Sequence, residues 1–300
     1  MAKIKFREMR MNNANKQRLD EINSIIEEYQ EDGYVLTLRQ LYYQLVSRDI
    51  IPNKQAEYSK LSTLLKEGRM AGIVDWDAIE DRLRKPESPS SFKSPKAILR
   101  AAIEQYALPR QKGQRTYVEV WVEKDALSGV LKRVTEKYHI PILVNRGYSS
   151  ASAMYDAYNR FARHSGSEML CKILYLGDYD PSGLDMIRDI EDRIREFIAG
   201  SDDPIIYDMN FEIEPIALTR EQIDLYKPPP NPAKITDPRA KDFIKEYGET
   251  SWEVDALRPD VLNNLLEQSI LQAIDEDLYL EIVSREDADK DKLRSLTKYL

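Results

Sequence analysis

Residues 174–184 have the sequence LYLGDYDPSGL, and this stretch decides the expected fold. An apolar run is followed by two carboxylates, Asp178 and Asp180, and then a proline and a glycine open a helical pattern. In open α/β sheets, ligands bind beyond the carboxyl ends of the strands, where such a turn from strand to helix lies. No basic residue stands between Lys172 and Arg188, so the two acids need an explanation.

Strands and helices alternate on both sides of this stretch. The β-rich runs are 117–122, 140–147, 172–177 and a run that begins at 211; the helical patterns between them are 126–138, 152–163 and 184–198. Alternation at these lengths predicts βαβ units and a mainly parallel sheet. Residues 116–300 are therefore expected to form one α/β domain with a C-terminal extension.

The first part of the chain has a different pattern. Apolar residues at helical spacing predict three short helices. The first covers 13–31, the second begins after its N-cap Thr37, and the third covers 54–69. Such helices favour a winged-helix or related helix-turn-helix domain over residues 1–90. Prolines and serines in 86–95 indicate a linker, placed at 91–115. The expected fold class is thus mixed α/β, with a helical winged-helix-like domain followed by a parallel α/β domain.

The composition indicates what class of protein this is and which ligands a metal site in it would have. A 42% hydrophobic and 32% charged chain of 300 residues is typical of a globular protein. Apolar runs are too short to span a bilayer, and residues 1–10 lack the apolar core of a signal peptide, so we expect a cytoplasmic protein without a membrane partner. One cysteine and two histidines exclude a thiolate-rich or histidine-rich zinc site, so a bound metal would need oxygen ligands, as Mg²⁺, Mn²⁺ or Ca²⁺ do.

Charge is distributed unevenly along the chain. The net charge is −8, yet residues 1–116 carry +5 and residues 117–300 carry −13. A basic first part joined to an acidic second part suggests a nucleic-acid-binding module attached to another function. Chance segregation of surface charge is the alternative explanation.

Two of the expected strands end in acids. The run 117–122 ends at Glu123, and the run 172–177 ends at Asp178 and Asp180. Carboxylates gathered at one sheet edge are costly unless a cation compensates them, so these three residues predict a site for Mg²⁺ or Mn²⁺. Asp180 before a proline also has the pattern of a helix N-cap, and both roles can coexist. Asp125 is interpreted as the N-cap of the helix that follows it, 126–138.

Three motifs around these acids resemble those of a known family. VEKDALSGVL (122–131), GYSSA (147–151) and LGDYDPSGLDM (176–186) occur in this order. They resemble a Toprim domain, most closely that of the topoisomerase VI A subunit and its relative, the meiotic double-strand-break transesterase. The second motif lacks the proline and acid of the family. The resemblance implies that Glu123, Asp178 and Asp180 form a Mg²⁺-binding triad.

The same resemblance implies a tyrosine nucleophile in a helix-turn-helix domain that precedes the Toprim domain. The stretch TLRQLYYQL contains Arg39, Tyr42 and Tyr43 in the family's arrangement of arginine and paired tyrosines, with Tyr43 as nucleophile. A phenol with a pKa near 10 needs a neighbouring cation or base to ionise, and Arg39 lies one helical turn before Tyr43. Arg39 could also bind the scissile phosphate. The alternative is that both tyrosines serve packing, and Tyr42 is expected in the core.

Further basic residues could contact DNA phosphates without reading sequence. The candidates are Arg48, Lys54, Arg69, Arg82, Arg84 and Lys124 of the VEKD motif; Lys60 was also considered. Near the C-terminus, LTREQIDLYKPPPNPAK (218–234) followed by SWEVDAL (251–257) also resembles the family. Glu253 and Asp255 of this region are interpreted as structural, with a contribution to the acidic site as the alternative.

The sequence thus predicts Mg²⁺-dependent cleavage of double-stranded DNA through a phosphotyrosyl link, in a topoisomerase VI A-like enzyme. The resemblance implies a homodimer, and a separate ATPase subunit stays open because this chain has no Walker A motif. A prokaryotic protein of this kind would associate with the nucleoid, and the compact length suggests a mobile element. Two alternatives remain: a hydrolytic Toprim nuclease that uses metal-activated water, and a non-catalytic DNA-binding protein with a vestigial site.

Overall fold

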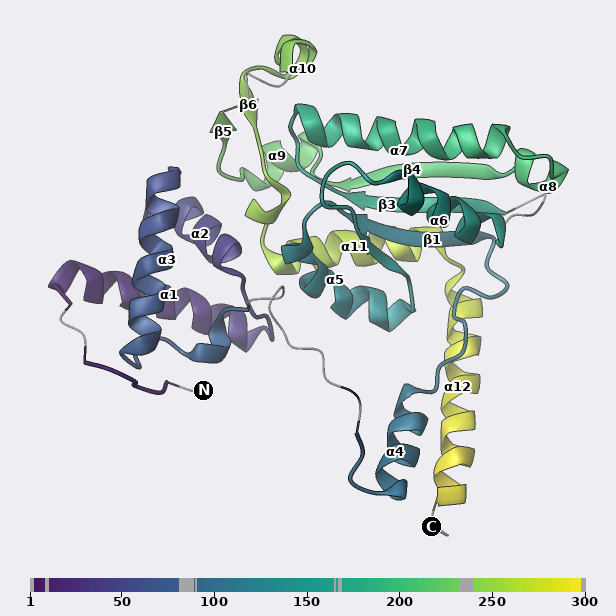
Figure 1. Cartoon of the computed structure of the whole chain (residues 1–300), viewed down its shortest axis with the longest axis horizontal. Helices are drawn as coiled ribbons and strands as arrows, with labels where there is room; N and C mark the ends of the chain where they lie inside the picture. The colour runs from purple at the N-terminus through teal and green to yellow at the C-terminus, as the bar shows by residue number, and fades with distance from the viewer. Residues whose placement is uncertain are drawn as a thin grey trace.

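The computed structural model describes residues 3–8, 11–80, 89, 91–164, 166, 169–232 and 240–297. A helical N-terminal unit and a larger α/β unit are distinguishable in Figure 1, and a long connection leads from the first to the second. None of the helices in these ranges has both the length and the apolar character that crossing a membrane requires.

A four-stranded parallel sheet forms the centre of the α/β unit. Its order is β2-β1-β3-β4, and its strands are β1 (Thr116–Val122), β2 (Ile142–Val144), β3 (Leu170–Leu176) and β4 (Asn210–Ala217). Val122 of β1 lies opposite Val144 on one side and Leu176 on the other. The carboxyl ends of these three strands therefore meet at one edge. The predicted mixed α/β class and parallel sheet are confirmed.

Helices cover both faces of this sheet (Figure 1). On one face lie α5 (Asp125–Tyr138) and α11 (Pro259–Ala273); on the other lie α6 (Ala151–Ala162) and α7 (Pro181–Ala199). Alternate residues of β1 point to opposite layers, with Val120 in the first core and Trp121 in the second. Burial on both faces explains why the central strands β1 and β3 are mostly apolar.

The N-terminal unit has its own hydrophobic core. It contains α1 (Asn13–Glu31), α2 (Leu38–Ser47), α3 (Gln55–Met70) and the 3₁₀ turn η1 (Trp76–Ala78). Thr37 caps α2 as predicted, and the side-chain oxygen of Gln40 accepts a hydrogen bond from the backbone N–H of Thr37 at 2.8 Å. Single bridges join Lys5 to Ala71 and Leu36 to Ile79. The wing itself stays a prediction, since residues 81–88 and 90 lie outside the described ranges.

The expected linker at 91–115 contains a helix that the sequence analysis did not predict. Helix α4 (Pro95–Gln105) extends away from the sheet beside α12 (Glu276–Leu296), as Figure 1 shows. The Tyr106 hydroxyl donates to Asp289 of α12 at 3.2 Å. Serine and proline mark a helix start here, because Ser94 caps α4 and Pro95 occupies its first turn.

Short elements complete the α/β unit and its C-terminal extension. They are α8 (Pro204–Tyr207), α9 (Arg220–Tyr226), β5 (Asn231–Pro232), α10 (Ala240–Tyr247), β6 (Thr250–Ser251) and the 3₁₀ turn η2 (Val254–Ala256). The turn η2 joins the two units, because Val254 packs in the core of the sheet and Ala256 packs in the core of the N-terminal helices. It therefore fixes α2 relative to the carboxyl edge of the sheet.

We predict that Glu286→Gln lowers the free energy of unfolding by about 1–3 kcal/mol at pH 7. The buried Glu286 carboxylate accepts hydrogen bonds from Arg110, Lys290 and the N–H of Leu108. Burial alone would raise its pKa, but these partners hold the pKa at about 2, below its usual 4.5. This stabilisation should be complete above about pH 4.5 and disappear as the pH falls toward 2.

Urea denaturation followed by circular dichroism at several pH values measures this effect. Glu281→Gln is the matched control, because Glu281 is exposed on the same helix, α12. If Glu286→Gln lost as much stability as the wild type between about pH 4.5 and pH 2, the prediction would be wrong.

Candidate metal and tyrosine site

Acidic residues gather at the carboxyl edge of the sheet. Glu123 follows β1 and Asp178 follows β3, and these strands are neighbours in parallel register. The backbone N–H of Asp178 donates to Glu123 Oε2 at 3.0 Å. The tertiary structure thus brings together two of the three predicted metal ligands, although 55 positions separate them in sequence.

Lys124 is the counter-ion of this edge. Its Nζ lies 2.7 Å from Asp178 Oδ1, 2.8 Å from Glu253 Oε2 and 2.8 Å from Asp255 Oδ1. Burial alone would lower the pKa of Lys124, but these three carboxylates raise it above its usual range. Lys124 was predicted to bind DNA; here it contacts carboxylates of its own chain, and the DNA-binding role stays a prediction.

The two carboxylates nearest the strand ends, those of Glu123 and Asp178, have raised pKa values. Burial raises the pKa of Asp178, and Glu123 and Asp255 raise it further, while Lys124 opposes them. Burial likewise raises the pKa of Glu123, with a contribution from Asp180, against the hydrogen bond from Asp178 and the charge of Lys124. Ionised carboxylates are therefore disfavoured at this edge unless additional positive charge is present.

Asp180 has the capping role that the sequence analysis left open. Its Oδ1 accepts the N–H of Gly183 at 2.7 Å and the Ser182 hydroxyl at 2.8 Å. A Cβ on Gly183 would lie 2.1 Å from the carbonyl oxygen of Asp178, so only glycine permits this turn. The expected cap at Asp125 is wrong: Lys124 is the N-cap of α5, and Asp125 is its first residue and pairs with Arg146 at 3.0 Å.

Glu253 and Asp255 connect this edge to the predicted tyrosine helix. The Arg39 guanidinium of α2 forms ion pairs with Glu253 and, through Nε at 2.9 Å, with Asp255 Oδ2. The same two carboxylates contact Lys124. The sequence analysis interpreted them as structural; they lie between the two cations of the site and hold both.

Tyr43 lies beside this network but is covered. Only 4% of its surface is exposed, and the centre of its ring is 6.0 Å from the Arg39 guanidinium. Burial raises the pKa of the phenol above its usual value of 10, and Glu253 and Asp255 raise it further; Asn231 and Arg39 lower it by less. The Tyr43 phenol is therefore protonated at neutral pH in this conformation.

Asn231 is a site residue that the sequence reasoning missed. Its Nδ2 lies 3.5 Å from the Tyr43 hydroxyl and 3.4 Å from Glu253 Oε1. Its Oδ1 accepts a hydrogen bond from Asn53 at 2.6 Å, and Asn53 also accepts the Tyr42 hydroxyl. Asn231 belongs to the stretch 218–234 that resembles the family, but no residue of that stretch is singled out there as a site residue. Tyr42 is buried at 4% exposure, as predicted.

The other basic candidates are not gathered at this site. Arg48 pairs with Glu28 at 2.7 Å, and the exposed Lys54 is the N-cap of α3. Arg69 donates to the carbonyl oxygens of Trp76 and Ile79, a contact that holds the N-terminal unit together. Arg82 and Arg84 lie outside the described residues. The DNA-binding roles of these residues stay predictions.

An open cavity of about 490 Å³ lies between α2, α3 and the start of α5. Arg39, Lys66 and Arg69 line it, together with Trp76 and Asp125. Arg39 is 45% exposed there, although its guanidinium also reaches Glu253 and Asp255. A phosphate that enters this cavity can therefore approach Arg39.

The donor set fits a hard divalent cation in its chemistry. Arg39 and Lys124 are the cations of an edge that holds Asp178, Glu253 and Asp255, with Glu123 near Lys124 and Asp180 near Glu123. Ionisation of all five carboxylates leaves an excess of negative charge. Within the described ranges, no group of three or more histidine, cysteine, aspartate or glutamate side chains is arranged to hold a metal ion. Asp178 Oδ1 is engaged by Lys124 and by the N–H of Val254.

Comparisons with known proteins give no assignment for this site. No model of a protein family and no curated protein sequence matches the chain.

We predict that Lys124→Met lowers the free energy of unfolding by about 3–5 kcal/mol in EDTA, because Asp178 would remain buried without a counter-ion and Asp255 would keep only Arg39. Chemical denaturation measures the effect. Lys132→Met is the matched control, since Lys132 is exposed on the same helix, α5. A Lys124→Met variant as stable as the control would show that the carboxylates do not need this cation.

Proposed function

We propose that this chain is a Mg²⁺-dependent, DNA-cleaving enzyme of the topoisomerase VI A type, which forms a phosphotyrosyl link to double-stranded DNA. One observation carries the proposal: Arg39 of the tyrosine helix shares the carboxylates Glu253 and Asp255 with Lys124, which in turn contacts Asp178. Asn231 connects Glu253 of this network to the Tyr43 hydroxyl. The motif residues from the two parts of the chain thus lie in one continuous polar network.

The residues have separate roles in the proposed reaction. Tyr43 attacks a phosphorus atom of DNA through its phenol oxygen, the bond from phosphorus to a deoxyribose oxygen breaks, and that oxygen takes up a proton. Arg39 binds the phosphate oxygens with its planar guanidinium. Glu123, Asp178 and Asp180 would hold Mg²⁺, which stabilises negative charge on the phosphate when bound. Asp178 must exchange its contact with Lys124 for this role.

The described conformation corresponds to a resting state in this proposal. Tyr43 is covered, the pKa of its phenol is raised, and Arg39 is engaged by Glu253 and Asp255. Binding of a phosphate to Arg39 would remove one partner of Glu253 and Asp255. Assembly of a homodimer, in which Tyr43 of one protomer meets the acids of the other, and the action of a separate ATPase are the further proposals that follow from the resemblance.

The covered tyrosine also favours a second function, hydrolysis of DNA by metal-activated water. This reaction uses Glu123, Asp178 and Asp180 and does not require Tyr43 to reach the phosphate. It differs from the first function in its product, which has free ends and no protein attached.

Cleavage of supercoiled plasmid in Mg²⁺ or Mn²⁺ tests both functions. We expect protein-linked breaks from the wild type and a loss of at least about 100-fold in Tyr43→Phe and in Asp178→Asn, because each removes a group required for the chemical step. Reactions are stopped with detergent and analysed before and after proteinase treatment. Tyr29→Phe, a conservative change at another buried tyrosine, and Asp192→Asn, at an exposed acid of α7, are the controls.

The products separate the two functions. Free-ended breaks that persist in Tyr43→Phe and vanish in Asp178→Asn would replace the transesterase by the hydrolytic nuclease. If the protein binds DNA without cleaving it, and neither Asp178→Asn nor Mg²⁺ changes the binding, both cleavage functions are contradicted. The chain would then be a DNA-binding protein with a vestigial site.

A further inference from the structure

A second cavity lies at the opposite edge of the sheet. It has a volume of about 840 Å³, and its wall includes Tyr117 at the start of β1, Met169 just before β3 and Pro141 just before β2. It is thus at the amino ends of the strands, about 20 Å from the acidic edge for a strand of this length. Neither the proposed metal site nor the tyrosine helix contributes to it.

The wall of this cavity is rich in positive charge. Arg110, Lys112 and Arg115 line it, and no described aspartate or glutamate does. Lys112 and Arg115 are exposed and form no ion pair with any described residue. Nε of Arg110 is buried and has no hydrogen-bond partner within the described ranges. In a chain with a net charge of −8, such a cavity favours an anionic ligand.

The acids behind this wall are already compensated. Glu119 accepts two hydrogen bonds from Arg160, at 2.7 and 2.9 Å. Glu286 pairs with Arg110 at 3.0 Å and with Lys290 at 2.6 Å. Because each acid has its own cation, the charges of Lys112 and Arg115 are left for a ligand.

An aromatic stack forms another part of the wall. Tyr117 is buried and His164 is exposed; their rings are 3.8 Å apart between centres and inclined by only 6°. The Tyr117 hydroxyl donates to Glu119 at 3.1 Å, which fixes the orientation of its ring. A planar ring of a ligand can extend this stack on the exposed imidazole. His139, the other histidine of the chain, also lines the cavity.

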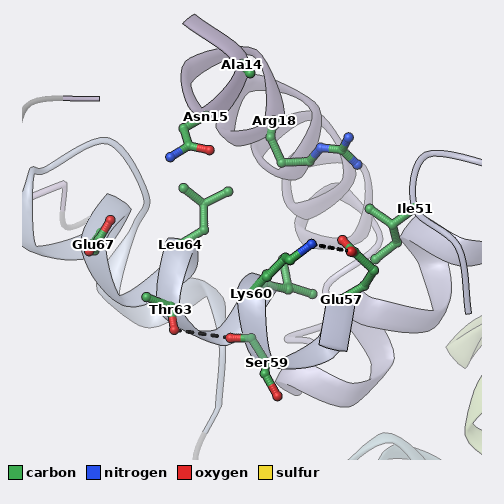
Figure 2. Close-up of a pocket in the computed structure, with 11 residues that line it drawn as sticks. Ala14, Asn15, Arg18, Ile51, Glu57, Ser59, Lys60, Thr63, Leu64 and Glu67 are labelled. Carbon is green, nitrogen blue, oxygen red and sulfur yellow. Dashed lines mark hydrogen bonds and ion pairs between the residues drawn. The ribbon is translucent and has the colours of Figure 1, made fainter. Parts of the chain in front are cut away.

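A third cavity, between α1 and α3, has a different lining. Its volume is about 560 Å³. Figure 2 shows that Arg18 and Lys60 line it together with Glu57 and Glu67. Lys60 is paired with Glu57 at 2.7 Å. Cations and acids balance each other there, and the lining contains no aromatic side chain. The combination of unpaired cations and an aromatic stack thus distinguishes the cavity at the amino edge.

We propose that the cavity lined by Lys112, Arg115 and His164 binds a nucleoside 5′-phosphate unit, with the phosphate on the two cations and the base stacked on the imidazole. Such a unit can come from a free mononucleotide or from the 5′-phosphorylated end of a single strand. This site is separate from the proposed cleavage site and does not depend on the proposed function.

Calorimetric titration of the full chain with adenosine 5′-monophosphate in EDTA tests the proposal, because EDTA prevents phosphate binding through a divalent cation at the acidic edge. We expect binding that weakens about tenfold in the double variant Lys112→Ala/Arg115→Ala. His164→Ala should weaken the mononucleotide about tenfold and inorganic phosphate much less, since only the base stacks. Lys96→Ala/Arg100→Ala, with the same charge change on exposed residues of α4, is the control and should alter binding less than about twofold.

Trinucleotides with and without a 5′-phosphate distinguish the two sources of the ligand. Tighter binding of the 5′-phosphorylated trinucleotide than of the mononucleotide would assign the cavity to strand ends; the reverse order would assign it to free nucleotides. The proposal is overturned if the mononucleotide does not bind at millimolar concentration, if adenosine without phosphate binds equally well, or if the control pair weakens binding as much as Lys112→Ala/Arg115→Ala.

Discussion

The ion pairs of Lys124, whose side chain is only 16% exposed, are the interactions on which the arrangement of this molecule depends. Lys124 follows β1 and contacts Asp178 after β3, and it reaches Glu253 and Asp255 at the η2 turn. A charge taken out of water needs partners, and so do the carboxylates that surround it. Because Glu253 and Asp255 also bind Arg39 of α2, one network determines how the tyrosine helix lies against the sheet.

In this network, the ion pairs within the chain compete with the binding of the proposed metal ion and phosphate. Negative charge in excess at Glu123 and Asp178 favours a divalent cation, whereas Lys124 already neutralises part of that charge. Arg39 would have to bind phosphate to assist Tyr43, whereas Glu253 and Asp255 hold it. A cation near Asp178 would weaken its ion pair with Lys124, and a phosphate near Arg39 would weaken the ion pairs of Arg39 with Glu253 and Asp255. Occupation of either position is therefore expected to affect the other through Glu253.

The two edges of the parallel sheet have opposite electrostatic character. Acids follow the strands at the carboxyl edge, while Arg110, Lys112 and Arg115 lie beside the amino edge. The three cations belong to residues 1–116 and the acids to residues 117–300, so this separation agrees with the uneven distribution of charge along the chain. Arg115 is adjacent in sequence to β1 and Glu123 follows its end, and the strand that joins them keeps the two charged regions apart.

The sequence by itself determined the elements, because hydrophobic periodicity and capping residues act over a few positions. Alternating strands and helices, the Thr37 cap and the turn at Asp178 to Gly183 follow from such local patterns, and the parallel sheet follows from the alternation. Local patterns could not show that Pro95 begins a helix that packs on α12, since that depends on a distant partner. Only the tertiary structure decided the partners of Lys124, the place of Asn231 beside Tyr43 and the burial of that tyrosine, because these contacts join residues between 54 and 188 positions apart.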